Sequence, residues 1–183
     1  MKDLSEVKQK LIKDLVKNKK FHQLEFEIKS LLLEKRSSFL LNLLGVSKIS
    51  KIPTSKKDLN ESLDLFKEAY LKNKTLTDAL FNYAEISIRL LKYDEAKDLL
   101  IEYLSKKKYD YKATLALARI HFYLGNMNEC LVNYKKIIDN NEANSKLWSA
   151  FLFTTNYTYK YSQKDYLNFC KKYSEKLEKF DEK

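Results

Sequence analysis

The 183-residue sequence contains only two glycines and one proline. Few positions therefore interrupt helices, and tight hairpin turns, which favour glycine, have few natural sites. Two glycines are also too few for a glycine-rich phosphate loop. These absences predict an all-α chain. The 44% content of hydrophobic residues is enough to bury a continuous apolar seam between helices.

Histidine and cysteine are also scarce, with two of each. His22 and His121 lie far apart in sequence, and the cysteines do not have the close spacing of zinc ligands. Cys130 and Cys170 fall at apolar helical positions, so we expect two buried free thiols in a reducing compartment, with a disulfide as the alternative. Acidic pairs such as Asp94-Glu95 fall at helix starts, where they oppose the helix dipole. We therefore expect no enzymatic activity, metal or cofactor.

Arginine accounts for only three of the 35 basic residues, although the formal net charge is +10. The charge is +4 over residues 1–36, +3 over 37–74, zero over 75–144 and +3 over 145–183. Nucleic-acid readers favour arginine for forked phosphate and guanine contacts. Binding to nucleic acid or to an anionic membrane surface is therefore a minor alternative.

Long apolar runs are absent as well. No stretch approaches the roughly 18 apolar residues that a membrane-spanning helix needs. The first residues also lack the apolar segment of a signal peptide, because lysines interrupt the place where it would lie. We expect a cytoplasmic protein.

The sequence does contain a repeat with a period of 34 residues. Residues 93–96, followed by Leu100 and Tyr103, match residues 127–130, followed by Tyr134 and Ile137. Weaker copies begin at Leu59 and Phe21. Self-similarity of this period is typical of stacked helix pairs, in which each unit buries its apolar face against its neighbours.

The repeat predicts one solenoid domain over residues 1–183. Its predicted units are residues 5–37, 38–74, 75–108 and 109–142, followed by a degenerate fifth unit and a capping helix over 145–180. Within the second unit, Gly45 would let the paired helix approach closely. Ile49–Asp58 reads as a long surface loop around Pro53. In the fourth unit, Gly125-Asn126 suits a left-handed turn between helices.

The clearest units resemble the tetratricopeptide repeat. The resemblance covers about residues 5–155, and Lys108 and Glu142 stand where that family has a closing proline. It implies a right-handed α-solenoid of antiparallel helix pairs, with four to five repeats, that binds a protein or peptide without catalysing a reaction. The residues that fit best are Leu80, Tyr83, Ala84, Tyr93, Ala96 and Leu100.

A second resemblance is confined to residues 147–157. This segment, followed by a predicted helix over 163–173, resembles the junction between the repeats and the catalytic lobes in O-linked N-acetylglucosamine transferase and SPINDLY-type glycosyltransferases. The lobes themselves are absent. The resemblance implies an alternative function as a stand-alone repeat arm that recruits substrate protein for a separate catalytic chain. Of the asparagine row found in such arms, Asn82 is present, whereas Ala116 and Ala150 occupy later positions.

The repeat frame also predicts a binding face. In the tetratricopeptide family the first helix of each pair lines the concave side. Aromatic, aliphatic and arginine side chains there would suit an extended peptide carrying acidic groups. An ordinary solvated surface is the alternative. The candidate residues are Asn42, Phe81, Asn82, Glu85, Arg89, Leu115, Arg119, Phe122 and Tyr123.

Overall fold

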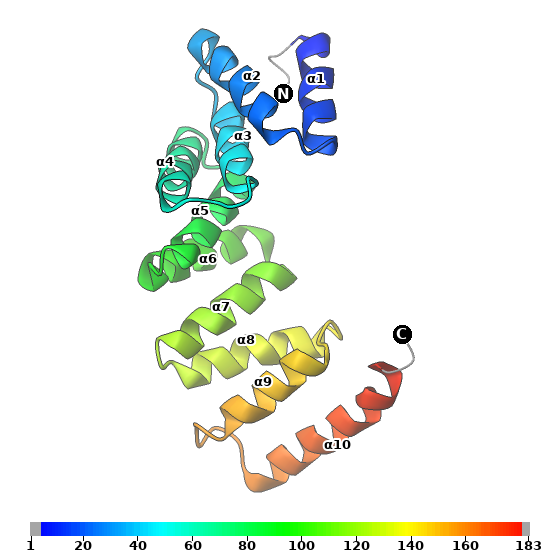
Figure 1. Cartoon of the computed structure of the whole chain (residues 1–183). Helices are drawn as coiled ribbons and strands as arrows, with labels where there is room; N and C mark the ends of the chain where they lie inside the picture. The colour runs from blue at the N-terminus through cyan, green and yellow to red at the C-terminus, as the bar shows by residue number, and fades with distance from the viewer. Residues whose placement is uncertain (1–4, 181–183) are drawn as a thin grey trace. The chain divides into compact units, whose positions relative to one another are not determined.

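The computed structural model describes residues 5–180, with side chains to residue 177, and contains ten α-helices in that range (Figure 1). No strand occurs among these residues, which confirms the predicted all-α class. The helices are α1 (Glu6–Lys17), α2 (Phe21–Glu34), α3 (Ser38–Ile49), α4 (Lys56–Lys72), α5 (Thr77–Arg89), α6 (Tyr93–Lys107), α7 (Tyr111–Tyr123), α8 (Met127–Asp139), α9 (Ser145–Thr155) and α10 (Gln163–Phe180).

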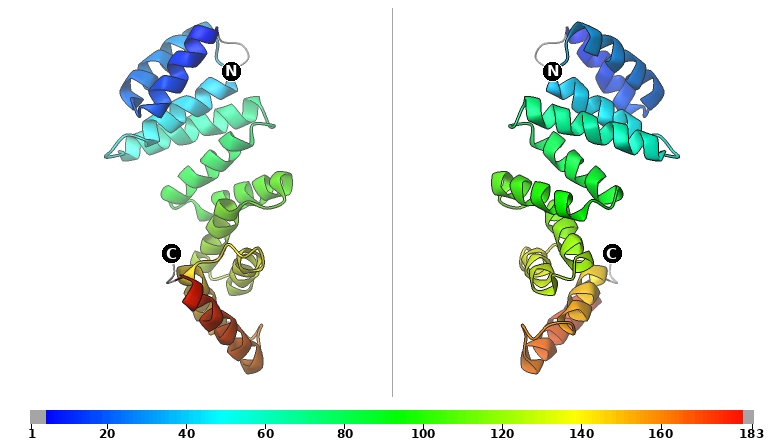
Figure 2. Two further views of the ribbon diagram at one scale, coloured as in Figure 1. Left: turned by 90° about the vertical axis from the view of Figure 1, so that its right-hand side faces the viewer. Right: turned by 90° about the vertical axis from the view of Figure 1, so that its left-hand side faces the viewer.

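The helices pack in the order of the chain, as a solenoid requires. α1 packs on α2, α3 on α4, α7 on α8, and α9 on α10. Figure 2 shows α3 and α4 lying side by side in both views. These four pairs fall within residues 5–37, 38–74, 109–142 and 145–180. The fold is a tetratricopeptide-like solenoid, as expected. Residues 1–4 and 181–183 of the predicted domain lie outside the described residues.

The chain divides into two compact units, residues 1–99 and 100–183. In the first unit, α1, α2 and α3 share one apolar cluster, and a second cluster includes Leu63 and Phe66 of α4 with Tyr83 and Ile86 of α5. In the second unit, one cluster joins α7, α8 and α9, and α10 packs against it through Phe169 and Tyr173. No helix among the described residues is long and apolar enough to cross a membrane.

Serine, aspartate and asparagine side chains begin many of the helices. Ser55 shows the full arrangement, because its hydroxyl accepts from the Asp58 backbone N–H while the Asp58 carboxylate accepts from the backbone N–H of Ser55. Such caps satisfy backbone donors that the helix itself leaves unpaired. Side-chain caps of this kind are Ser5, Ser37, Ser55, Asp110 and Asn144.

Gly45 lies where α3 and α4 approach most closely, as its sequence position predicted. A Cβ atom placed on Gly45 would lie 2.6 Å from Cε1 of Phe66, a side chain with no exposed surface. The hydroxyl of Ser62 on α4 also donates to the Gly45 carbonyl, at 3.2 Å. A side chain at position 45 would therefore push the two helices apart.

A buried ion cluster joins α2, the C-terminal end of α3 and α4. Glu25 is 8% exposed, and its carboxylate lies 2.8 Å from Nζ of Lys29 and 3.3 Å from Nζ of Lys48. It also pairs with Lys51, while Lys48 pairs with Glu61. Burial raises the pKa of Glu25, but the hydrogen bonds to its lysine partners outweigh this and lower the pKa to about 2. The cluster therefore holds a charged carboxylate inside the first unit.

The turns between helices use left-handed backbone. Gly125 has a φ of 77°, as predicted, and the equivalent residue one repeat earlier is Leu91, with a φ of 61°. Most residues other than glycine are strained by about 1–2 kcal/mol in this region. Leu91 is 70% exposed, so its side chain contributes little burial.

Replacing Leu91 with glycine should therefore raise the free energy of unfolding by about 0.5–1 kcal/mol, because the strain disappears and little apolar contact is lost. Urea denaturation followed by circular dichroism would measure the change. Gly125→Leu, the reciprocal exchange, should destabilise by a similar amount. An unchanged or lower stability of Leu91→Gly would show that the turn at Leu91 is not strained.

Both cysteines are free thiols, as predicted, but only Cys130 is buried. Cys170 is half-buried because it lies on the outer part of α10, the last described helix, against which no further helix of the described chain packs. The prediction of two buried thiols is therefore wrong for Cys170.

Candidate functional site

The nine predicted site residues fall in both units, and each unit is considered separately. The first unit holds Asn42 on α3 and Phe81, Asn82, Glu85 and Arg89 on α5, and the second holds Leu115, Arg119, Phe122 and Tyr123 on α7.

In the first unit, the structure brings Asn42 and Asn82 together. Nδ2 of Asn82 donates to Oδ1 of Asn42 at 2.9 Å, and both side chains are half-buried. The two amides therefore bridge α3 and α5, which pack against each other. Arg89 is exposed.

In the second unit, the predicted residues split into two kinds. Leu115 and Phe122 are partly buried and pack against the apolar cluster that joins α7, α8 and α9. Arg119 and Tyr123 are exposed. The rings of Phe122 and Tyr123 meet edge to face, with centroids 6.3 Å apart. Phe122 thereby supports the position of the Tyr123 ring.

Sequence reasoning missed the continuation of this surface on α9. The 34-residue period relates Lys112, Arg119 and Tyr123 to Lys146, Phe153 and Tyr157. Lys112, Arg119 and Tyr123 are spaced so that they share one face of α7, and Lys146 and Phe153 share one face of α9, whereas Tyr157 lies in the turn after α9 ends. All six are exposed, with Tyr123 63%, Phe153 52% and Tyr157 56% exposed. Extending the repeat frame into the fifth unit would have found the second set.

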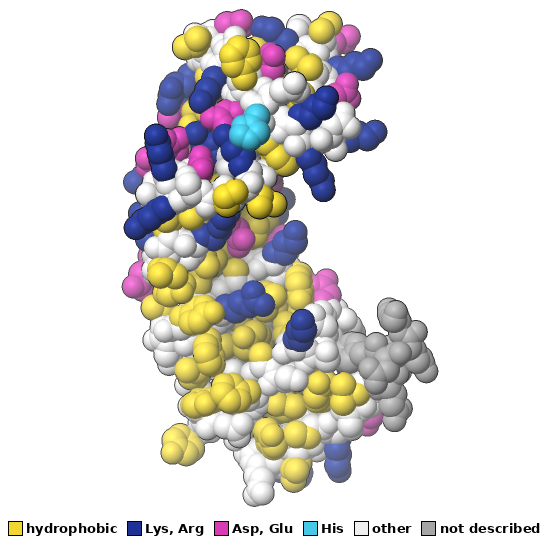
Figure 3. Space-filling model, in the orientation of Figure 1, with side chains coloured by type: hydrophobic (Ala, Val, Ile, Leu, Met, Phe, Trp, Pro, Cys, Tyr) yellow, Lys and Arg dark blue, Asp and Glu magenta, His cyan; other side chains and the backbone are white. Residues whose placement is uncertain are grey.

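We call these six residues the α7–α9 face. Both helices pack on α8 and contribute to one apolar cluster, so they belong to the same compact unit. Neither α7 nor α9 contains an aspartate or a glutamate. Exposed aromatic rings and cations therefore occur on this face without an acid from its own helices. In Figure 3, apolar side chains gather over α7, α8 and α9.

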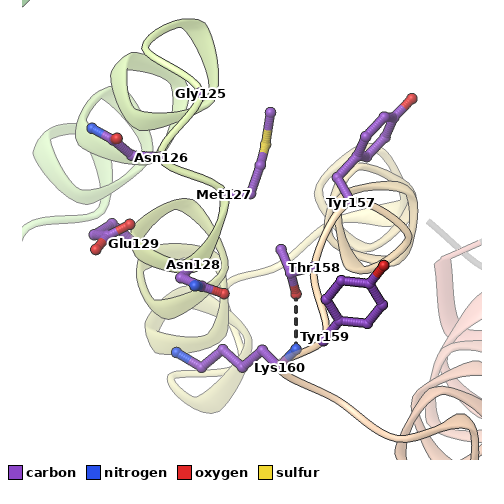
Figure 4. A pocket seen from close by; sticks show the side chains of 9 residues that line it. All are labelled: Gly125, Asn126, Met127, Asn128, Glu129, Tyr157, Thr158, Tyr159 and Lys160. Carbon is purple, nitrogen blue, oxygen red and sulfur yellow. Dashed lines mark hydrogen bonds between the residues drawn. The ribbon is translucent and has the colours of Figure 1, made fainter.

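A cleft of about 780 Å³ adjoins the C-terminal ends of α7 and α9. One side is the turn from Gly125 to Glu129, and the other is the loop from Tyr157 to Lys160. Figure 4 shows the Lys160 side chain extending from this loop toward the first turn of α8. The backbone N–H of Lys160 donates to the Thr158 hydroxyl, at 3.1 Å, which orders the loop. The cleft thus extends the face with further tyrosine and lysine side chains.

The core beneath the face is rigidly packed. Trp148 is 1% exposed and stacks on Tyr173, with ring centroids 5.9 Å apart and planes 14° from parallel. Burial raises the pKa of the Cys130 thiol to about 11, so this thiol stays protonated and unreactive at neutral pH. Packing of these residues positions α9.

The side chains of the face offer means of binding. Within residues 5–180 no three histidine, cysteine or acidic side chains are grouped so that they could hold a metal ion. Exposed rings can contact apolar or proline side chains, and the guanidinium and ammonium groups can pair with carboxylates.

Helix pairs that recur along the chain and pack on the helices next to them in the stack form a solenoid fold of the tetratricopeptide type. The solved structures that share this fold include crystal structures of MamA. One structure of MamA has a TM-score of 0.79 and 16% identity, covering 98% of this chain and 94% of that chain. A double mutant of MamA RS-1 has a TM-score of 0.78 and 13% identity, covering 97% and 96%. Residues 41 to the end of MamA from Desulfovibrio magneticus RS-1 give 0.76 and 12%, covering 96% and 94%.

At these identities the likeness establishes the fold alone. No protein-family model matches the chain, and no curated protein matches it. The structures of MamA do not support the resemblance of residues 147–157 to a glycosyltransferase junction. The helix expected after this segment is present as α10. It packs on α9 through Tyr173.

Proposed function

We propose that the protein is a non-catalytic scaffold that binds an extended segment of another protein on the α7–α9 face. One observation carries the proposal. Equivalent positions of two successive repeats expose three aromatic rings and three cations, with five of these residues on helices that contain no acid and Tyr157 in the turn after α9. Monomeric surfaces expose scattered apolar residues, but a set aligned along two repeats indicates recognition.

The order of residues along each helix suggests what the partner presents. Lys112 and Lys146 lie near the N-terminal ends of α7 and α9, Tyr123 is the last residue of α7, and Tyr157 follows in the turn after α9 ends at Thr155. A segment with acidic residues over the lysines and Arg119, and with apolar or proline residues over the rings, would match this order. Extended segments lose less conformational entropy when their prolines already hold them open.

The predicted residues of the first unit form a second part of the proposal. Phe81, Glu85 and Arg89 lie on α5 at the positions that correspond to Leu115, Arg119 and Tyr123. We propose that they contribute to peptide binding within their own unit. Free thiols are consistent with a reducing compartment, and we propose a cytoplasmic location.

A peptide array probed with the full chain tests the function. The array would hold extended segments that combine acidic and apolar residues, beside versions with lysine in place of each acid. We expect binding to the acidic versions, and a loss of at least about fivefold in Arg119→Ala and in Phe153→Ala, since each removes one exposed contact of about 1 kcal/mol. Leu167→Ala is the matched control, because Leu167 is 54% exposed on α10 and lies outside the face.

Three results would contradict the proposal. Retained binding in Phe153→Ala would place the site elsewhere. Equal binding of acidic and lysine-substituted peptides would show that the cations of the face do not pair with acidic residues of the partner. Salt-dependent binding to DNA or anionic vesicles, without peptide binding, would favour the electrostatic alternatives.

A further inference from the structure

Helix α2 has apolar side chains on two different faces. One face, with Leu24, Ile28 and Leu31, is buried against α1 and α3. The other carries Phe26 and Leu33, which are 73% and 90% exposed. These two residues are seven positions apart, so they lie on the same side of the helix, about 10.5 Å from each other along its axis. Packing within the first unit does not explain this second face.

The second face borders a hollow of about 630 Å³ in the surface of the first unit. Leu32 on α2 and Leu44 on α3 contribute further apolar surface to it, and Ser30 is its one uncharged polar residue. We call this hollow the α2 groove, lined by Phe26, Lys29, Ser30, Leu32, Leu33, Arg36 and Leu44.

The charged side chains that line the α2 groove are both cations. Lys29 and Arg36 have side chains that are 58% and 59% exposed. Each already has one acidic neighbour: Lys29 lies 2.8 Å from Glu25, and Nε and Nη2 of Arg36 donate to Glu68 at 2.7 and 2.6 Å. Both retain further N–H donors directed at solvent, since an ammonium has three and a guanidinium five.

A smaller hollow of about 300 Å³ continues the groove toward α4. It shares Lys29, Arg36 and Leu44 with the α2 groove, and Glu61, Asp64 and Glu68 of α4 line its other side. Lys29 and Arg36 thus lie between the apolar α2 groove and a hollow whose other side carries three acids of α4 beside Lys48. A ligand in the α2 groove would direct its carboxylates to Lys29 and Arg36 and keep them away from α4.

We propose that the α2 groove docks an amphipathic helix of a partner protein, with apolar residues one and two turns apart and acidic residues beside them. Such a helix covers Phe26 and Leu33 at the spacing that they present, and its carboxylates pair with Lys29 and Arg36. The site is independent of the α7–α9 face, because it lies wholly within the first unit.

A second copy of this chain does not fit the groove through α1 or α10. The amphipathic helices near its two ends, α1 and α10, each contain two more basic than acidic residues, so the cations of the groove repel them. A lipid surface also fits poorly, because the apolar residues line a hollow and Glu34, beside Leu33, pairs with Lys8 at 3.0 Å. The chemistry that fits is an acidic amphipathic helix.

Two stapled helical peptides with the same leucine face would test the site. One has glutamates beside the leucines and the other has lysines, and fluorescence anisotropy with the full chain measures their affinities. We expect the glutamate peptide to bind at least about tenfold tighter. Phe26→Ser combined with Leu33→Ser should weaken it at least about tenfold, and both residues are exposed enough to be replaced without unfolding the chain.

Leu71→Ser is the matched control. Leu71 is 59% exposed on α4 and lines neither hollow, so its replacement should change the affinity by less than about twofold. Equal affinities for the two peptides, absence of binding, or full binding by the double variant would each overturn the proposal. Binding to anionic vesicles that requires Phe26 and Leu33, without peptide binding, would assign the groove to lipid and overturn it as well.

Discussion

Replacing Gly45 with alanine should lower the free energy of unfolding by about 2–3 kcal/mol. In most helices this exchange stabilises by about 0.5–1 kcal/mol, because alanine restricts the unfolded chain and favours the helix. Here the new methyl group would lie 2.6 Å from the Phe66 ring, which is fully buried and cannot move aside without opening the α3–α4 contact. Urea denaturation followed by circular dichroism measures the loss.

The companion variant Phe66→Leu separates the steric cause from other effects. By itself, Phe66→Leu should lower the free energy of unfolding by about 1 kcal/mol, because it removes part of a buried ring. Combined with Gly45→Ala it should relieve the collision, so the double variant loses less than the sum of the two single losses. Strict additivity would show that the methyl group and the ring do not meet, and the close approach of α3 and α4 would then be incorrect.

Replacing Glu25 with glutamine should cost about 3 kcal/mol, because it leaves the buried ammonium of Lys48 with one carboxylate in place of two. Lys51 and Lys29 would lose the same partner. Glu27→Gln is the matched control, since it removes an equal charge from the same helix at a position outside the cluster. A loss in Glu27→Gln as large as in Glu25→Gln would indicate a general charge effect.

The same cluster predicts how stability depends on pH. The pKa of Glu25 is lowered from 4.5 to about 2 on folding, so its contribution is complete above pH 4.5. As the pH falls from 4.5 toward 2, the unfolded chain takes up the proton first and about 2–3 kcal/mol of stability is lost. The stability difference between the native chain and Glu25→Gln should shrink over this range. A constant difference between pH 6 and pH 2.5 would contradict the lowered pKa.

The sequence was sufficient for the helices and for their pairing. The scarcity of glycine and proline predicted a helical fold, and the 34-residue period predicted which helices form pairs. The roles of Gly45 and Gly125 were predicted correctly because each depends on the absence of a side chain. Gly45 leaves space for Phe66, and Gly125 adopts a left-handed turn. Leu91 shows the limit of that reasoning, since its own side chain gives no sign that it adopts the same turn.

The candidate site was predicted less completely. Arg119 and Tyr123 are exposed as expected, but Leu115 and Phe122 lie partly in the core, because a periodic pattern does not show where the edge of the buried stripe falls. Phe153 was missed because the candidate set was not extended into the fifth unit, and Tyr157 lies just after α9, where that unit departs from the repeat frame. Lys48 and Glu25 were missed because charged residues on a helix are usually solvated, and their burial follows from contacts among three helices.

By itself the sequence determined that the chain forms helices and which neighbours pair, because apolar spacing and backbone propensity act within about 40 residues. Only the tertiary structure decided which side chains remain in water. Phe26 and Leu33 are ordinary apolar residues in the sequence, and they become a docking surface because α2 has already buried its other face against α1 and α3. A side chain is exposed when no other helix packs over it. Its exposure therefore depends on residues far away in the sequence, which a local pattern does not include.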